Sequence, residues 1–156
     1  MKIKVIFPGK TDPLFIASVE EYINRMKQYV PFEMIILSEI KTTPFMTPDR
    51  IMEKEKEQML KQLLPGEEII LLDERGNTFS SREFAGFIQK KMNSGLKTLA
   101  FLAGGPYGFS PRIREIAASG LSLSKMTFSH QVVRVLFMEQ LYRAMAILHN
   151  EPYHHD

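Results

Sequence analysis

Residues 97–111 form the part of this sequence that most constrains its fold. The apolar run Lys97–Ala103 is bounded by turn residues and predicts a buried strand. Gly104 and Gly105 follow it, and because they lack β-carbons their backbone can adopt positive φ and lie directly against a ligand. Ser110–Pro111 then supplies an N-cap and a first-turn proline for a helix. This order is typical of ligand sites in α/β proteins, and it is equally compatible with an ordinary strand–helix turn.

The rest of the chain alternates between short apolar segments and longer segments with helical spacing. The predicted strands are Lys2–Pro8, Phe32–Ile40, Glu67–Asp73, Lys97–Ala103 and Leu121–Leu123. The predicted helices are Pro13–Val30, Thr47–Leu64, a segment that begins at a capping box of Ser80 and Glu83, Pro111–Ser119 and His130–Asn150. This alternation predicts an α/β fold with a mostly parallel sheet and helices on both faces.

The composition is that of a soluble globular protein, with 44% hydrophobic and 24% charged residues, and 156 residues predict a single domain, 1–156. The sequence has no cysteine, which excludes disulfides and cysteine nucleophiles and is typical of the reducing cytoplasm. No apolar run approaches membrane-spanning length, and we expect no signal peptide in Met1–Pro8, which is short and charged.

The charge distribution bears on possible polyanionic partners. Residues 1–96 balance 14 basic against 14 acidic side chains, whereas residues 97–156 hold six basic and four acidic ones. A contact with a polyanion is therefore expected in the C-terminal part. So small an excess does not by itself predict nucleic-acid binding.

The last predicted helix is apolar on more than one face. Its apolar residues include Val132, Val133, Val135, Leu136, Phe137, Leu141, Met145 and Leu148. Either the helix is sandwiched within the fold or one side packs on a second subunit, and the pattern slightly favours the second arrangement.

The sequence lacks the motifs of the common nucleotide-binding and hydrolytic sites, namely G-x-G-x-x-G, Walker A, H-E-x-x-H and G-x-S-x-G. His149, His154 and His155 have no partner at a recognised metal-ligand spacing, so we expect a solvated tail and no metal site. Asp73 and Glu74 are adjacent at a strand end and point to opposite sides, which argues against a shared carboxylate dyad.

Several segments, taken together and in order, resemble one known family. They are Ile69–Asp73, the Leu102–Gly108 segment LAGGPYG, the Leu121–His130 segment LSLSKMTFSH, Val132–Val135, the Glu139–Ala144 segment EQLYRA and Pro152–His154. By these segments, the sequence resembles the ribosomal RNA large subunit methyltransferase H family, a minimal branch of the SPOUT superfamily. The resemblance covers essentially the whole chain, and its most specific block runs from Leu121 to Arg143.

The resemblance implies a C-terminal trefoil knot that binds S-adenosylmethionine, and a homodimer built from the knotted regions. It also implies methyl transfer to N3 of a pseudouridine in the 23S rRNA of the assembled ribosome, hence a cytoplasmic enzyme. Two alternatives stay open, namely a non-catalytic ribosome-binding or assembly factor on the same fold and a SPOUT methyltransferase that acts on tRNA.

Nine positions at or just after the ends of predicted strands are candidates for the cofactor, eight from the resemblance and Gly105 because its bare backbone allows close approach. They are Leu72, Gly104, Gly105, Leu123, Ser124, Lys125, Met126, Thr127 and Phe128. Such a site suits an activated sulfonium donor, because the main task of the enzyme is then to align the reacting groups. The same residues could instead be strand ends that fill a core.

Five further residues are candidates for catalysis on the RNA side. His130 or His154 could accept the N3 proton, since an unperturbed histidine titrates near neutral pH. Arg134 and Arg143 could contact a phosphate or the deprotonated base, or form ion pairs with Glu139 one turn away. Tyr153 could stack on the target base or pin the tail.

The chain departs from the family pattern at its end. His155 and Asp156 follow Tyr153–His154, where the family tends to have lysine or arginine directly after the histidine. The role of the tail is therefore the least constrained part of the assignment.

Overall fold

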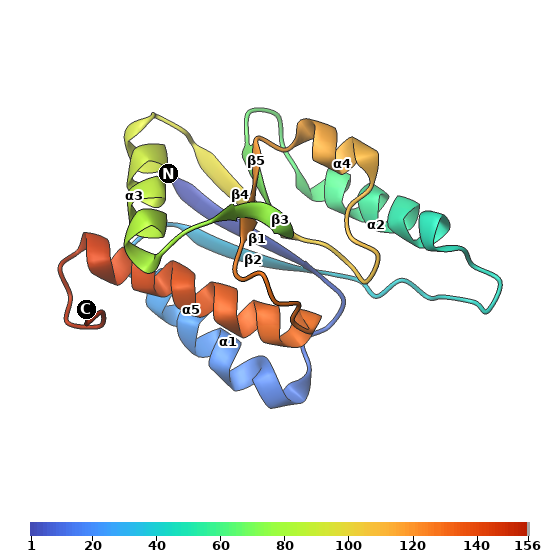
Figure 1. Cartoon of the computed structure of the whole chain (residues 1–156), viewed down its shortest axis with the longest axis horizontal. Coiled ribbons are helices and arrows are strands. Elements are labelled where there is room, and N and C mark those ends of the chain that lie inside the picture. The colour runs from blue at the N-terminus through green and yellow to red at the C-terminus, as the bar shows by residue number, and fades with distance from the viewer. Residues whose placement is uncertain (156) are drawn as a thin grey trace.

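A computed structural model describes residues 1–155 and shows one five-stranded sheet with helices on both faces (Figure 1). The strand order is β2-β1-β4-β3-β5, and all of the strand pairs are parallel. The strands are β1 (Lys2–Pro8), β2 (Phe32–Leu37), β3 (Glu68–Thr78), β4 (Thr98–Ala103) and β5 (Ser119–Ser122). This architecture confirms the predicted α/β class.

Five helices cover the sheet, and each begins at the polar cap that its sequence indicates. They are α1 (Pro13–Met26), α2 (Pro48–Gln62), α3 (Ser81–Asn93), α4 (Pro111–Ile116) and α5 (His130–Leu148). The capping box of Ser80 and Glu83 is present at α3. Several predicted elements were too long, notably the helix 13–30, which ends at Met26, and the strand 32–40, which ends at Leu37.

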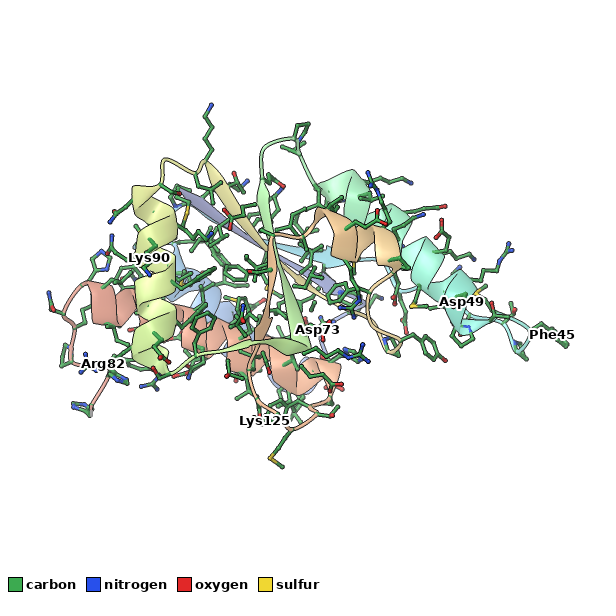
Figure 2. The ribbon with its side chains drawn as sticks, turned by 45° about the horizontal axis from the view of Figure 1, so that its top comes forward. Phe45, Asp49, Asp73, Arg82, Lys90 and Lys125 are labelled. Carbon is green, nitrogen blue, oxygen red and sulfur yellow. The ribbon has the colours of Figure 1, made fainter. Side chains whose placement is uncertain are left out.

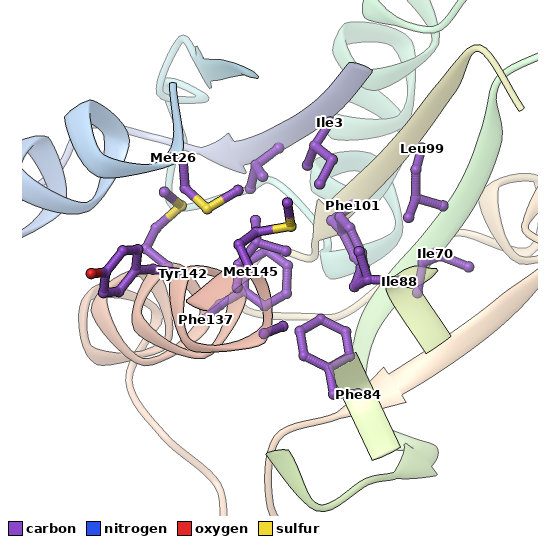
Figure 3. Close-up of a cluster of buried hydrophobic side chains, with 14 of the residues drawn as sticks. Ile3, Met26, Ile70, Phe84, Ile88, Leu99, Phe101, Phe137, Tyr142 and Met145 are labelled. Carbon is purple, nitrogen blue, oxygen red and sulfur yellow. The ribbon is translucent and has the colours of Figure 1, made fainter. Parts of the chain in front are cut away.

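Two apolar layers hold the helices to the sheet. The larger lies under α1, α3 and α5 and is built around Phe101, Phe137 and Met145, each fully buried (Figure 3). The smaller lies under α2 and α4 and includes Met59 and Ile113. The two layers use alternate side chains of the central strands, as expected for a sheet that is covered on both faces.

Helix α5 lies between α1 and α3 against the sheet (Figure 1). Its buried positions are Arg134, Phe137, Met138, Leu141, Tyr142, Ala144, Met145 and Ala146. The sandwiched arrangement therefore accounts for most of its apolar surface, while Leu136 remains 36% exposed. A second subunit on this helix stays a prediction. No helix within residues 1–155 is long and apolar enough to cross a membrane.

Strand β3 is longer than the predicted strand 67–73, because it continues through Gly76 and Asn77 to Thr78. It pairs with β5 twice, first through Ile70–Leu72 and then, after a register shift, through Asn77–Thr78. Gly76 permits this second contact, since a β-carbon there would lie 2.4 Å from the carbonyl carbon of Gly120. The close approach of two backbones is a tertiary property that the local sequence does not announce.

Candidate functional site

A cavity of about 460 Å³ opens beside the middle of β3 and at the carboxyl ends of β4 and β5. Eight of the nine positions predicted for a cofactor line it, and these are Leu72, Gly104, Gly105, Leu123, Ser124, Met126, Thr127 and Phe128. Lys125 does not line the cavity and lies exposed on the outer side of its loop (Figure 2). Segments up to 56 residues apart in sequence thus converge where parallel sheets place small ligands.

The glycine turn after β4 differs in detail from the expectation. Positive φ occurs at Gly108 (79°), and neither Gly104 nor Gly105 has it. A β-carbon on Gly104 would contact the Phe109 ring at 3.2 Å and the backbone of Gly108 at 3.3 Å. The absent side chain therefore leaves room for the turn itself. The positive φ that was predicted for Gly104 or Gly105 is therefore found at Gly108, the last glycine of the same turn.

The loop between β5 and α5 is held by its own polar side chains. Ser122 donates a hydrogen bond to the carbonyl of Ser124 (2.8 Å), and the Ser124 hydroxyl accepts one from the Met126 N–H (3.0 Å). Thr127 donates to Glu74 across the cavity mouth (3.3 Å). Met126 is 73% exposed, so an apolar side chain stands at the open site instead of in the core.

Charged residues in the middle of β3, where the predicted strand ended, also line the cavity and were not among the predicted site residues. Asp73 pairs with Arg114 at 2.5 Å, and Glu74 interacts with Thr127. The two carboxylates therefore have separate partners, as expected for adjacent strand residues. Burial tends to raise the pKa of Asp73, but hydrogen bonds from the Arg75 N–H and from Arg114 outweigh it and lower that pKa. The sequence signal that could have identified Asp73 and Glu74 as cavity residues is their position at the end of the predicted strand 67–73.

His130, the first residue of α5, lies between this cavity and a second one. Partial burial, and then the charge of Arg134, lower the pKa of its imidazole. The neutral form that can accept a proton is therefore favoured near neutral pH. This placement is compatible with the predicted base role, which stays a prediction.

Arg134 is only 1% exposed and is bound to the chain's own β1–α1 connection. Its guanidinium donates hydrogen bonds to the carbonyls of Pro8 (2.5 Å) and Gly9 (2.9 Å) and to the hydroxyl of Thr11 (2.8 Å). Both arginines had an ion pair with Glu139 as their predicted alternative. Arg143 forms that ion pair, whereas Arg134 has the partners given above. Arg134 thus fixes the loop that borders the second cavity.

The remaining candidates gather at the other end of α5. Glu139 forms an ion pair with Arg143 and accepts a hydrogen bond from the Tyr153 hydroxyl (3.2 Å). The Arg143 guanidinium lies 4.7 Å from the centre of the Tyr153 ring and 3.4 Å from Nδ1 of His154. Within this chain, Tyr153 pins the tail and Arg143 forms an ion pair one turn away, the two arrangements predicted as alternatives to contacts with RNA. Among residues 1–155 no group of three or more potential metal ligands occurs.

The predicted site residues therefore form two separate groups. Helix α5 has 19 residues from His130 to Leu148, and at 1.5 Å per residue its ends lie about 27 Å apart. Figure 1 shows the C-terminal tail at the end of α5 that lies away from the cavity loops. A single chain does not bring His130 and Tyr153 to one site.

The fold and the cavity define a class, an α/β protein with a small-molecule site formed by loops at the carboxyl ends of a parallel sheet. A family model described as "Predicted SPOUT methyltransferase" matches residues 1–154. The chain belongs to this family, and within it to the ribosomal RNA large subunit methyltransferase H group, as the following relatives show.

Curated relatives with the name "Ribosomal RNA large subunit methyltransferase H" match over essentially their full length. The relative from Parabacteroides distasonis is 49% identical over 100% of both chains, and that from Flavobacterium psychrophilum is 48% identical over 99% of both. A solved structure of a probable methyltransferase from Bordetella pertussis has a TM-score of 0.56 at 13% identity, covering 92% of this chain and 93% of its own. That likeness supports the fold alone, and the family assignment confirms the resemblance noted from the sequence.

Proposed function

We propose that this chain transfers the methyl group of S-adenosylmethionine to N3 of a pseudouridine in the 23S rRNA of the assembled ribosome, in the cytoplasm. The observation that carries the proposal is the convergence of eight predicted cofactor positions on one cavity. The full-length similarity to relatives named as rRNA methyltransferases supports the choice of substrate. Residues 1–156 act in it as a single SPOUT domain.

The residues of the cavity fit such a cofactor. S-adenosylmethionine supplies an activated methyl group on a sulfonium cation. Leu72 and Leu123 offer apolar walls, and the main chain of 123–128 offers donors and acceptors to a purine edge. Asp73 and Glu74 line the cavity together with Arg75 and Arg114, so the formal charges of these side chains balance. His130 lies where a group at the cavity mouth could lose a proton to it.

Binding and transfer test this proposal separately. We expect titration calorimetry to show one S-adenosylmethionine site per chain, and we expect labelled methyl groups to enter 23S rRNA when ribosomes are the substrate. Free RNA is expected to be the poorer substrate, because a net charge of +2 supports few phosphate contacts.

The outcomes separate the alternatives. Ribosome binding without affinity for the cofactor would identify an assembly factor, and methylation of tRNA in preference to ribosomes would identify a tRNA enzyme. Either result contradicts the proposal.

The separation of the two residue groups along α5 supports a homodimer. We infer that the tail cluster of one protomer, Arg143 with Tyr153 and His154, completes the cavity of its partner. Leu136, exposed on α5, and the half-buried Val135 offer apolar surface for such an interface.

A chain that ends at Pro152 tests the role of the tail. We expect its affinity for S-adenosylmethionine to change by less than about twofold and its methyl transfer to fall about 100-fold or more, because acceptor positioning is lost. Calorimetry and a ribosome methylation assay measure the two effects.

Mixing variants tests whether the tail acts on a partner. The truncated chain and a full-length His130→Ala chain are each expected to be inactive alone and to recover activity together, since a mixed dimer then has one complete site. Ultracentrifugation should show dimers for the parent and both variants. A monomeric parent with full activity, or no recovery on mixing dimers that exchange subunits, contradicts the arrangement.

A further inference from the structure

A second cavity, of about 500 Å³, lies beside the first at the carboxyl ends of β1 and β2. The β1–α1 and β2–α2 connections, helix α2 and the first turns of α5 form its walls. The two cavities share Gly105, Pro106, Tyr107 and His130. An enzyme that joins two substrates needs two adjoining pockets, and the described residues provide such a pair at this boundary.

Glu55 of α2 lies at that boundary. Its carboxyl group takes the space that a side chain on residue 105 would fill, because a β-carbon on Gly105 would lie 2.0 Å from Oε1 and 2.4 Å from Oε2. Glu55 lines the second cavity while only 6% of its surface is exposed. The carboxyl group that most closely approaches the glycine turn is therefore also one that faces the second cavity.

The Glu55 carboxyl is not satisfied by the described residues. Its Oε2 atom is buried and has no hydrogen-bond partner within residues 1–155. Burial raises the pKa of this carboxyl and so favours its neutral form, which can both donate and accept a hydrogen bond.

A buried carboxyl without a partner destabilises a folded chain, so its presence calls for a reason. The Nε atom of Arg134 is likewise buried and without a partner among the described residues, and Arg134 lines the same cavity. Glu55 lines this cavity next to its shared boundary with the first one, and its incompletely paired carboxyl favours a polar ligand that donates a hydrogen bond there.

We propose that the second cavity receives the target base, and that Glu55 determines specificity by accepting a hydrogen bond from N1–H of pseudouridine through its carboxyl group. This inference rests on the proposed function and extends it to the choice of base. Uridine is joined to ribose through N1 and has no hydrogen there, whereas pseudouridine is joined through C5 and keeps N1–H. A buried acceptor left unpaired by uridine disfavours that base strongly.

The variant that tests this inference is Glu55→Met, which keeps the length of the side chain and removes its polar atoms. We expect the parent to methylate pseudouridine-containing ribosomes faster than ribosomes whose target nucleotide has remained uridine. In Glu55→Met this preference is expected to fall about tenfold or more, mainly through a slower reaction with pseudouridine. Affinity for S-adenosylmethionine should remain that of the parent.

Two further measurements separate this role from a structural one. Glu55→Met is expected to melt at a higher temperature than the parent, because an unsatisfied buried carboxyl is removed, so loss of preference would accompany a gain in stability. Glu57→Met, on the exposed side of the same helix and outside both cavities, should leave the preference and the rates unchanged.

The outcomes are distinct. A parent that methylates pseudouridine ribosomes, together with a Glu55→Met variant of unchanged preference, overturns the role of Glu55 and leaves the proposed function standing. A parent without preference between the two bases overturns it as well. A parent that methylates neither ribosome contradicts the proposed function and this inference with it. If Glu55→Met fails to fold, Glu55 is a structural residue and the inference is wrong.

Discussion

Gly76→Ala is expected to abolish stable folding of the chain. The added β-carbon would lie 2.4 Å from the carbonyl carbon of Gly120, 2.5 Å from the N atom of Leu121 and 2.7 Å from the Gly120 oxygen. All three are backbone atoms of β5, so no side chain can rotate away. One of the two strands must move, and β3 and β5 then lose the second of their two paired segments. We expect a loss of about 4 kcal/mol or more in the free energy of unfolding.

Gly86→Ala is the matched control, because Gly86 lies in α3 with open space around its α-carbon. There the same substitution should raise the free energy of unfolding by about 0.5–1 kcal/mol, since alanine loses less conformational freedom in a helix. Circular dichroism during urea titration measures both variants. A Gly76→Ala chain that unfolds at the parent's urea concentration would show that the two backbones do not approach as described.

Lys4→Met is expected to produce the second-largest loss of stability. Lys4 is a buried cation on β1 whose ammonium group donates hydrogen bonds to Glu67 (2.6 Å) and to the carbonyl of Gln62 (2.9 Å). The side chains of Lys4 and Glu67 are only 4% and 6% exposed. Removing the lysine leaves a buried carboxylate without its counter-charge, and breaking such a pair costs about 3–5 kcal/mol.

A double-mutant cycle separates the pair from the packing of its side chains. In Lys4→Met with Glu67→Gln, the uncompensated charge is gone and the amide oxygen can still accept the hydrogen bond from the Leu64 N–H. We expect the double variant to recover most of the lost stability. Lys2→Met is the control, because its ion pair with Glu33 is 41% exposed on both sides and is worth less than about 1 kcal/mol. Equal losses for Lys2→Met and Lys4→Met would contradict the prediction.

Local patterns in the sequence were sufficient for the elements and their class. Apolar periodicity and polar caps predicted every helix and strand of the described chain, and alternation predicted the parallel sheet. The errors lie at element ends, as in β3, where contact with β5 extends the strand past Asp73 to Thr78. Pairing with a distant strand supplies hydrogen bonds that no local window contains.

The candidate cofactor positions were assigned mainly by the resemblance to the family, and sheet geometry explains why eight of them meet at one cavity. Residues that follow parallel strands meet at one edge of the sheet, so Leu72, Gly104 and Leu123 had to lie near one another once the strands were identified. What could not be predicted was the use of individual side chains. The sequence offered Arg134 either an RNA contact or an ion pair with Glu139. It did not announce the hydrogen bonds of Arg134 to Pro8, Gly9 and Thr11, more than 120 residues away in sequence.

The sequence by itself determined the α/β class, the five strands and five helices of the described residues, the family and the loops that line the first cavity. These depend on local periodicity and on motifs that stay contiguous in the chain. Only the tertiary structure decided that Glu55 lies against Gly105 and that His130 and Tyr153 stand at opposite ends of α5. Those relations depend on how helices pack across the sheet, where residues 50 positions apart come into contact through burial and close packing.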